Sequence, residues 1–565
     1  MRRLATLIRK YGLLILFFLI IGYMYYANTI HETFPDEFDN IVGGWYITRG
    51  TLPSVGFFSP HHPGAYVIAS VITVFTKQSF VKFRLVWGGV LFLTTVLSYI
   101  FLKRRLGKST TFFYLYYILL LALGSTYFWG QMLLSETIVG YALVPVYFLI
   151  ILKDLYKKKL TTRDLIIISL STFIALFTSM TFIFSVLILI ILTGFYYIKQ
   201  NRLFSKSTLV VLFIFIAPYI LLGVYLILSG SLEKFYFSSV YYNREYYIYN
   251  FPVVAGKVSK HPLRYAISIF YNTSLQFYVL LQQAKNFNFA YPVNITLLLG
   301  NLFFIFYLLT RKKIVIAVAV YIFLIFLNAR SEPLNSGETD FHSTVYIMIS
   351  LANTAWVLFT LVKELQNKIP DEAKRYFYIS MTGILGVYTF FITSFFTFKF
   401  SEKAYTKFMG QMPAIYDYPV AAPIINKIVS SNEYFWIGPF EFQELLYING
   451  KLPSKYQWFL PAHEKSDRIK KELIDDLTKN RPKLIVFKDY LTYFGTSPKD
   501  YNYPIVNFLS EHYFRIKDLD SDSKKIKINY MNLHNFDIYT DFYFDKDRKE
   551  EIMKKLSEEH IIEPL

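Results

Sequence analysis

Long apolar segments with short polar connections fill the chain from its start to Phe398. A helix that crosses a bilayer needs about 20 apolar residues, with a range near 17 to 25. By that measure eleven spans are predicted, at residues 11–28, 83–102, 111–129, 132–152, a two-span hairpin over 165–197, 208–228, 293–309, 314–327, 344–362 and 376–398. Residues 64–75 are apolar but too short to cross, so they are predicted to lie in the interface or to re-enter the membrane.

Basic residues cluster between these segments, at 103–108, 153–159, 311–313 and 363–368. With eleven spans all four clusters fall on one side, which the positive-inside rule makes cytoplasmic. Arg2 and Arg3 precede the first span, so the N-terminus is predicted inside and the C-terminus outside. The first apolar run is long and no small-residue cleavage pattern follows it, which favours a retained signal anchor.

Composition agrees with a membrane protein. The 565 residues are 54% hydrophobic and only 18% charged, whereas a soluble domain carries about 25% charged residues. The net charge of +19 is a topology signal here and not a nucleic-acid surface, because the basic residues lie between apolar runs. The sequence has no cysteine, which excludes disulfides, thiolate metal sites and cysteine nucleophiles.

The pattern changes after Phe398. Residues 433–438 and 483–488 have the character of strands, and residues 467–479 and about 546–560 have that of helices. This alternation predicts a small α/β layer domain with a largely parallel sheet. The predicted fold is therefore a polytopic α-helical membrane domain, residues 1–398, followed by an exterior α/β domain, residues 399–565. Two long outer loops, 31–82 and 229–292, belong to the first domain in this prediction.

The first outer loop carries the densest group of titratable residues. Asp36, Glu37 and Asp39 lie within four positions, and two adjacent histidines, His61 and His62, follow. Charges next to the top of a helical bundle are costly, which favours a reaction site. The alternative is a solvated loop whose acids only cap a short helix.

Three motifs occur in order around this loop: Pro35-Asp36-Glu37 after the first span, His62-Pro63 near its end, and Phe83-Arg84-Leu85 at the start of the second span. Together they resemble the GT-C glycosyltransferases of the protein O-mannosyltransferase and lipid A aminoarabinose transferase type. The resemblance runs from the N-terminus to about Phe398. It departs at Gly64, where a second proline is usual. The exterior domain has only a general likeness to domains appended to some members.

The resemblance implies a GT-C-like fold and an inverting glycosyltransferase. Such an enzyme moves a sugar, hexosyl or pentosyl, from a polyprenyl phosphate to a hydroxyl of a protein, glycan or lipid on the outer membrane face. It needs a carboxylate to take the acceptor proton and cationic groups to hold the leaving phosphate. By position, Asp36 matches the family base, and Glu37 completes the Asp-Glu pair.

Further substrate and phosphate contacts are predicted outside the acidic pair: His62, Arg84, Glu136, Arg330 and His342. Each has a plainer alternative. Arg84 could be an interfacial anchor, His62 an exposed loop residue, and Glu136 a helix-start carboxylate favoured by the dipole. A tyrosine-rich run at residues 241–249 fits either a substrate groove or an interfacial aromatic belt.

No cofactor is predicted, although a divalent cation is an alternative. Asp36 and Asp39 are three residues apart and would share one face of a helix, where they could offer oxygen ligands. Two carboxylates alone make a poor metal site. The predicted partners are a polyprenyl-phosphate sugar, a hydroxyl acceptor and membrane lipid, without nucleic acid.

Two other classes of protein are alternatives to a glycosyltransferase. A transporter or lipid flippase would place charges along an intramembrane path and repeat its fold in inverted halves, but charges within the spans are almost absent and no repeat is evident. A receptor or scaffold gives no reason for acids, histidines and arginine to converge. The sequence identifies neither the sugar nor the acceptor.

Overall fold

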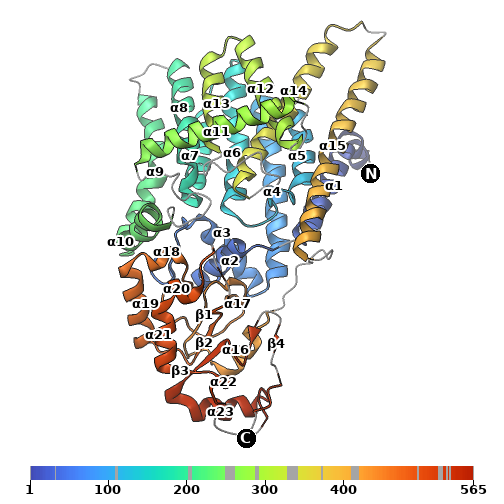
Figure 1. Ribbon diagram of the computed structural model, residues 1–565. Helices are drawn as coiled ribbons and strands as arrows, with labels where there is room; N and C mark the ends of the chain where they lie inside the picture. Colours follow the sequence, from blue (N-terminus) through green and yellow to red (C-terminus); the bar gives the residue numbers. More distant parts are fainter. Residues whose placement is uncertain are drawn as a thin grey trace. The chain divides into compact units, whose positions relative to one another are not determined.

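The computed structural model describes residues 2–31, 33–107, 112–200, 206–247, 261–286, 292–327, 341–370, 373–408, 419–490, 492, 495–519, 526–529, 532–533 and 536–563 (Figure 1). By internal contacts the chain divides into two compact units. We call the first the helical unit; it comprises Met1–Thr33, Phe80–Val224 and His261–Ile415. The second, the sheet unit, comprises Phe34–Ser79, Tyr225–Lys260 and Tyr416–Leu565.

Each of the eleven predicted spans coincides with a helix. These helices are α1 (Arg2–Thr29), α4 (Phe80–Leu106), α5 (Phe112–Gly124), α6 (Ser135–Leu155), α7 (Thr162–Thr178), α8 (Ile183–Gln200), α9 (Lys206–Leu228), α12 (Pro292–Thr310), α13 (Ile314–Leu327), α14 (Thr344–Gln366) and α15 (Lys374–Phe408). A further helix, α11 (Pro262–Lys285), lies in the predicted outer loop 229–292. Its asparagine, glutamine and serine residues lower its hydropathy, so the apolar pattern alone did not reveal it.

Within the described residues, seven helices are long and apolar enough to cross a membrane, or eight if the pair Leu212–Leu228 and Leu232–Tyr247 is one span. Shorter apolar helices are Gly64–Thr76, Phe112–Gly124 and Ile314–Leu327. The protein is a multi-pass membrane protein. The number of eleven stays a prediction, because three of the helices are short: α5 has 13 residues, α13 has 14 and α7 has 17, whereas a bilayer-spanning helix needs about 20.

A buried polar network joins three helices of the helical unit. Asn301 of α12 donates to Ser350 Oγ of α14 at 2.8 Å. Asn353 of α14 donates to Asn301 Oδ1 at 2.9 Å and accepts from the Tyr147 hydroxyl of α6 at 3.1 Å. Hydrogen bonds of this kind hold helices together where lipid provides no hydrophobic drive.

Charged residues meet at the basic ends of these helices. Asp164, at the start of α7, pairs with Lys153 of α6 at 2.6 Å and with Arg105 of α4 at 3.2 Å. Lys313, just before α13, pairs with Asp154 at 2.5 Å. Three of the four basic clusters that were predicted to share one side, those with Arg105, Lys153 and Lys313, therefore meet at one end of the unit.

The sheet unit is built on a four-stranded sheet of order β1-β2-β6-β3, with β1 Phe435–Gly438, β2 Leu484–Phe487, β6 Phe542–Asp545 and β3 Tyr513–Phe514. Only β1 and β2 are parallel, with Phe435 opposite Leu484; β6 is antiparallel to both neighbours. The prediction of a largely parallel sheet was therefore wrong. Helix α19 (Asp467–Lys479) lies between β1 and β2 in the chain, as a parallel crossover requires, whereas a small hairpin of β4 (Asn532–Leu533) and β5 (Phe536–Asp537) precedes β6.

Parts of the two predicted outer loops, Phe34–Ser79 and Tyr225–Lys260, belong to the sheet unit. They form α2 (Pro35–Thr48), α3 (Gly64–Thr76), α10 (Leu232–Tyr236), η3 (Phe237–Tyr241) and η4 (Asn243–Tyr247). One hydrophobic core contains Phe58, Phe237 and Tyr242 from the loops together with Trp436, Tyr456 and Ile485 from the C-terminal segment. By internal contacts these loop segments group with Tyr416–Leu565, and the predicted domain boundary at 398/399 stays a prediction. The predicted last helix is present as α23 (Lys549–Glu558).

Candidate functional site

The predicted acidic motif forms the first turn of α2. Phe34 is extended, with φ −142° and ψ 142°, and Pro35 occupies the first turn, where its missing N–H costs nothing. The carboxylates of Asp36 and Glu37 follow in the same turn, and the helix dipole favours them there. Asp36 is half-buried, whereas Glu37 and Asp39 are buried. The acids are therefore not a solvated loop.

Asp39 lies at the centre of a hydrogen-bond network. The Tyr66 hydroxyl of α3 donates to Asp39 Oδ2 at 2.7 Å, and Gln457 Nε2 of the C-terminal segment donates to Asp39 Oδ1 at 3.4 Å. Burial is the largest influence on this carboxyl and raises its pKa to about 7; the Tyr66 hydrogen bond opposes that rise and the nearby Asp36 adds to it. Asp36 and Asp39 are three residues apart and differ in environment: Asp36 is half-buried, and Asp39 is enclosed by protein.

Glycines on α2 make this network possible. A Cβ at Gly43 would lie 2.5 Å from Cδ1 of the Tyr66 ring, and a Cβ at Gly44 would lie 2.5 Å from Cβ of Ala69. Helices α2 and α3 therefore approach more closely than side chains would allow. Gly43 follows Asp39 by four residues and shares its face, so the space at Gly43 lets the Tyr66 hydroxyl reach Asp39.

The loop before α3 extends the network. Ser59 Oγ and the Tyr66 hydroxyl form a short hydrogen bond, and the His61 N–H donates to Ser59 Oγ at 3.0 Å. His62 is half-buried, with its ring edge-on to Phe235 and 5.5 Å between centroids. His62 thus lies in the sheet unit with Asp36, Glu37 and Asp39, as its place in the outer loop predicts.

Arg84, at the start of α4, is fully buried in the helical unit. Its Nη1 donates to the carbonyl oxygens of Thr29, at 3.2 Å, and His31, at 3.4 Å. A cation at the C-terminal end of α1 satisfies carbonyls that have no partner within the helix. Arg84 is therefore not an exposed snorkelling anchor, and it has a structural task besides its predicted phosphate contact.

Glu136 and His342 are also buried in the helical unit. Glu136 is in the first turn of α6, and His342 belongs to η6 (Phe341–Ser343), which packs against α6. Next to them Phe341 stacks on Trp129, with centroids 5.7 Å apart. Arg330 lies outside the described residues. The roles of all these residues in binding stay predictions.

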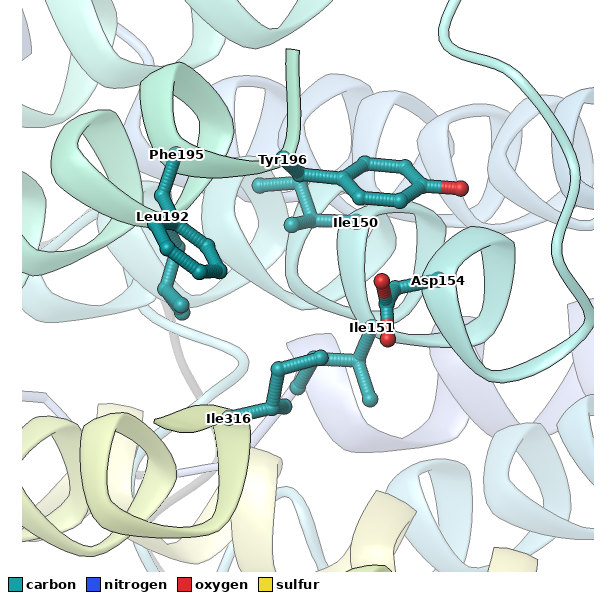
Figure 2. Close-up of a pocket in the computed structure, with 7 residues that line it drawn as sticks. All are labelled: Ile150, Ile151, Asp154, Leu192, Phe195, Tyr196 and Ile316. Atoms are coloured by element: carbon teal, nitrogen blue, oxygen red, sulfur yellow. The ribbon is translucent and has the colours of Figure 1, made fainter. Parts of the chain in front are cut away.

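Within the described residues, no group of three or more His, Asp or Glu side chains is arranged to hold a metal ion. Both carboxylate oxygens of Asp39 accept hydrogen bonds from protein groups, which competes with the cation alternative. A small pocket opens elsewhere, at the basic ends of α6, α8 and α13 (Figure 2). Its lining is mostly apolar, and its one carboxylate, Asp154, pairs with Lys313; it contains no predicted site residue.

The hydrogen-bond partners of Asp39, Tyr66 and Gln457, were not predicted from the sequence. Tyr66 follows His62 by four residues, and the paired glycines Gly43 and Gly44 gave a signal for a close helix contact there. Gln457 is separated from Asp39 by 418 residues, and nothing in its surroundings marks it.

No protein-family model and no curated protein matches the sequence. Among solved structures, ArnT from Cupriavidus metallidurans bound to undecaprenyl phosphate is similar, with a TM-score of 0.51 and 11% identity over 94% of this chain and 98% of that one. The apo state of ArnT from the same organism aligns with a TM-score of 0.48 and 12% identity, over 95% and 98% of the two chains. The first alignment confirms the GT-C-like fold that the three motifs predict.

Proposed function

We propose that the protein is an inverting membrane glycosyltransferase that moves a sugar from a polyprenyl phosphate to a hydroxyl. The observation that carries this proposal is the fold shared with ArnT, a protein seen bound to undecaprenyl phosphate, over nearly the whole of both chains. The acidic turn of α2 supports it. Asp36 is half-buried beside the buried Glu37 and Asp39, so it is partly withdrawn from solvent while one side stays open to an acceptor hydroxyl, as a general base requires.

In the proposed reaction the acceptor oxygen attacks the anomeric carbon as Asp36 takes its proton. The bond from that carbon to the phosphate oxygen breaks on the opposite face, and the polyprenyl phosphate leaves with the electron pair. Glu37 is the second carboxylate of the motif. Cationic groups stabilise the charge that develops on the phosphate; the candidates from the sequence are His62, Arg84, Arg330 and His342. Glu136, an acid, is instead a candidate contact to hydroxyl groups of the substrates.

The proposed orientation follows from the charge pattern. The N-terminus and the basic helix ends lie in the cytoplasm, and the sheet unit lies on the outer face. Transfer would then occur on the outer side of the membrane, where polyprenyl phosphate carriers present their sugars.

A deletion strain complemented with parent or Asp36→Asn protein tests the reaction. The parent should restore one sugar mass on a surface glycan, protein or lipid, and the variant should lose it, because a positioned base contributes about 10² to 10⁴-fold. Mass spectrometry of the surface material is the measurement, with variant abundance in the membrane as the control. Near-parental modification by Asp36→Asn would remove Asp36 from its role. That result would agree with a flippase, which needs no catalytic base at this position.

A further inference from the structure

The segment 454–463 of the sheet unit contacts the first outer loop at several points. The Phe58 N–H donates to the carbonyl oxygen of Lys455 at 2.7 Å. The Phe58 ring packs against the rings of Tyr456, at 5.2 Å, and His463, at 5.4 Å between centroids. From the same segment Gln457 reaches Asp39 on α2. This C-terminal segment therefore holds both the loop and the acidic helix.

Gln457 is an unusual side chain for that position. It is buried, and its Oε1 has no hydrogen-bond partner among the described residues. A buried amide with an unsatisfied oxygen is costly, and leucine would fill a similar volume without that cost. Within the described residues, the one side-chain hydrogen bond that Gln457 makes is from Nε2 to Asp39. We therefore attribute the presence of glutamine at this position to its bond with Asp39.

We infer that Gln457 and Tyr66 are positioning residues. From two different elements, the segment 454–463 and α3, they hold the two carboxylate oxygens of Asp39, an arrangement that we call the clamp, and thereby fix the first turn of α2, which bears Asp36. The inference rests on the proposed function and gives the exterior C-terminal segment a part in it. Asp36 and Asp39 lie about one turn apart on one helix face, so a restraint on Asp39 holds in place the backbone turn that bears Asp36. A reacting group displaced by about 1 Å can cost roughly 10²-fold in rate.

Three single variants test the clamp. Gln457→Leu and Tyr66→Phe each remove one donor to Asp39 with little change in volume, and each should lower sugar transfer roughly tenfold to a hundredfold. Gln457→Glu is nearly isosteric but places a second carboxylate against Asp39, so it should be the most impaired. Binding of undecaprenyl phosphate to the purified variants should stay within about twofold of the parent, because the clamp acts on the base and not on the lipid carrier.

A reciprocal exchange separates positioning from chemistry at Asp39. In Asp39→Asn/Gln457→Glu the amide and the carboxylate change places: the side-chain oxygen at position 39 still accepts from Tyr66, and its nitrogen donates to position 457. Transfer by this double variant should recover to within several-fold of the parent and exceed that of Gln457→Glu alone. If its transfer stays as low as that of Gln457→Glu, or lower, while the protein is folded, Asp39 takes part in the chemistry itself and the inference is overturned.

Tyr456→Phe is the matched control for Tyr66→Phe. It too removes a buried hydroxyl that donates to a carboxylate, Glu472 Oε2 at 2.6 Å, but this hydroxyl makes no hydrogen bond to Asp39.

Hydrogen exchange tests the clamp without a measurement of sugar transfer: amides of α2 should exchange faster in Gln457→Leu and Tyr66→Phe than in Tyr456→Phe. Equal exchange in all three would overturn the clamp. If the clamp is seen but the parent transfers no sugar, the proposed function fails instead.

Discussion

His463 is a titratable residue enclosed by aromatic rings in the core of the sheet unit. Its Nδ1 accepts the Leu460 N–H at 3.3 Å and lies 3.1 Å from the Tyr242 hydroxyl. The ring of Trp458 lies 4.3 Å away. Burial lowers the pKa of His463 to about 3, so the folded protein holds this imidazole neutral at pH values where the unfolded chain would protonate it.

The stability of the sheet unit should therefore depend on pH through His463. Between about pH 6.5 and 3 the unfolded state binds the extra proton, so the free energy of unfolding falls as the pH falls through this window. A pKa difference of one is worth about 1.4 kcal/mol, which makes the effect on the order of a few kcal/mol. Thermal unfolding of His463→Phe should show a flatter acid limb than the parent. Tyr242→Phe, which keeps the imidazole, should retain the parental slope; an unchanged slope in His463→Phe would contradict this account.

Arg84 combines a structural and a predicted binding role, and the two can be separated. Arg84→Ala leaves the carbonyls at the end of α1 without their donor, which costs about 1 to 3 kcal/mol, so its thermal stability should fall. Arg84→Lys should recover only part of the lost thermal stability, because one ammonium replaces a fork of donors.

Arg330→Ala should weaken binding of undecaprenyl phosphate roughly tenfold, the value of one charge-assisted contact. Parental affinity in both alanine variants would place the phosphate site elsewhere.

Among the elements, the contact of α2 with α3 shapes the acidic turn most directly. In Gly43→Ala the new Cβ would lie 2.5 Å from the Tyr66 ring, and overpacking of this kind costs about 1 to 3 kcal/mol. The variant should unfold at lower temperature and lose the Tyr66 hydrogen bond to Asp39. Gly89→Ala, on α4 with no atom within 4 Å of the new Cβ, is the control and should be neutral or slightly stabilising. Equal stability of the two variants would show that α3 can shift at no cost.

Elements with strong apolar character could be predicted from the sequence, and those with mixed character could not. All eleven apolar segments are helices, because a run of that length has no other way to satisfy its backbone in a membrane. Helix α11 was missed because polar residues interrupt its apolar face. The strand directions were predicted wrongly, because short strands carry no signal for their direction, which depends on connections such as the hairpin of β4 and β5. At the site, Asp36 stood out through its motif, whereas Gln457 is positioned by the fold alone.

For the whole molecule, the grouping of the outer loops with the C-terminal segment changes what a truncation would do. The domain boundary at 398/399 stays a prediction, and Phe58 and Tyr242 from the loops share a hydrophobic core with Tyr456 and Ile485 from the C-terminal segment. Removal of the C-terminal segment would expose this core and would take away Gln457, one of the two donors to Asp39. We expect a protein that ends near residue 408 to be unstable in the membrane and not a smaller working enzyme.

The side of the membrane on which each end lies can be tested directly, because the natural sequence has no cysteine and one introduced thiol is therefore a unique label. Lys554→Cys replaces a side chain of α23 that is 77% exposed, and Lys157→Cys replaces an exposed residue between α6 and α7. With an odd number of spans and the basic ends inside, a membrane-impermeant maleimide should label the first variant in intact cells and the second only after lysis. Labelling of Lys554→Cys only after lysis would place the sheet unit in the cytoplasm. The proposed transfer would then have to occur on the inner face, and the predicted count of eleven or the predicted orientation would be wrong.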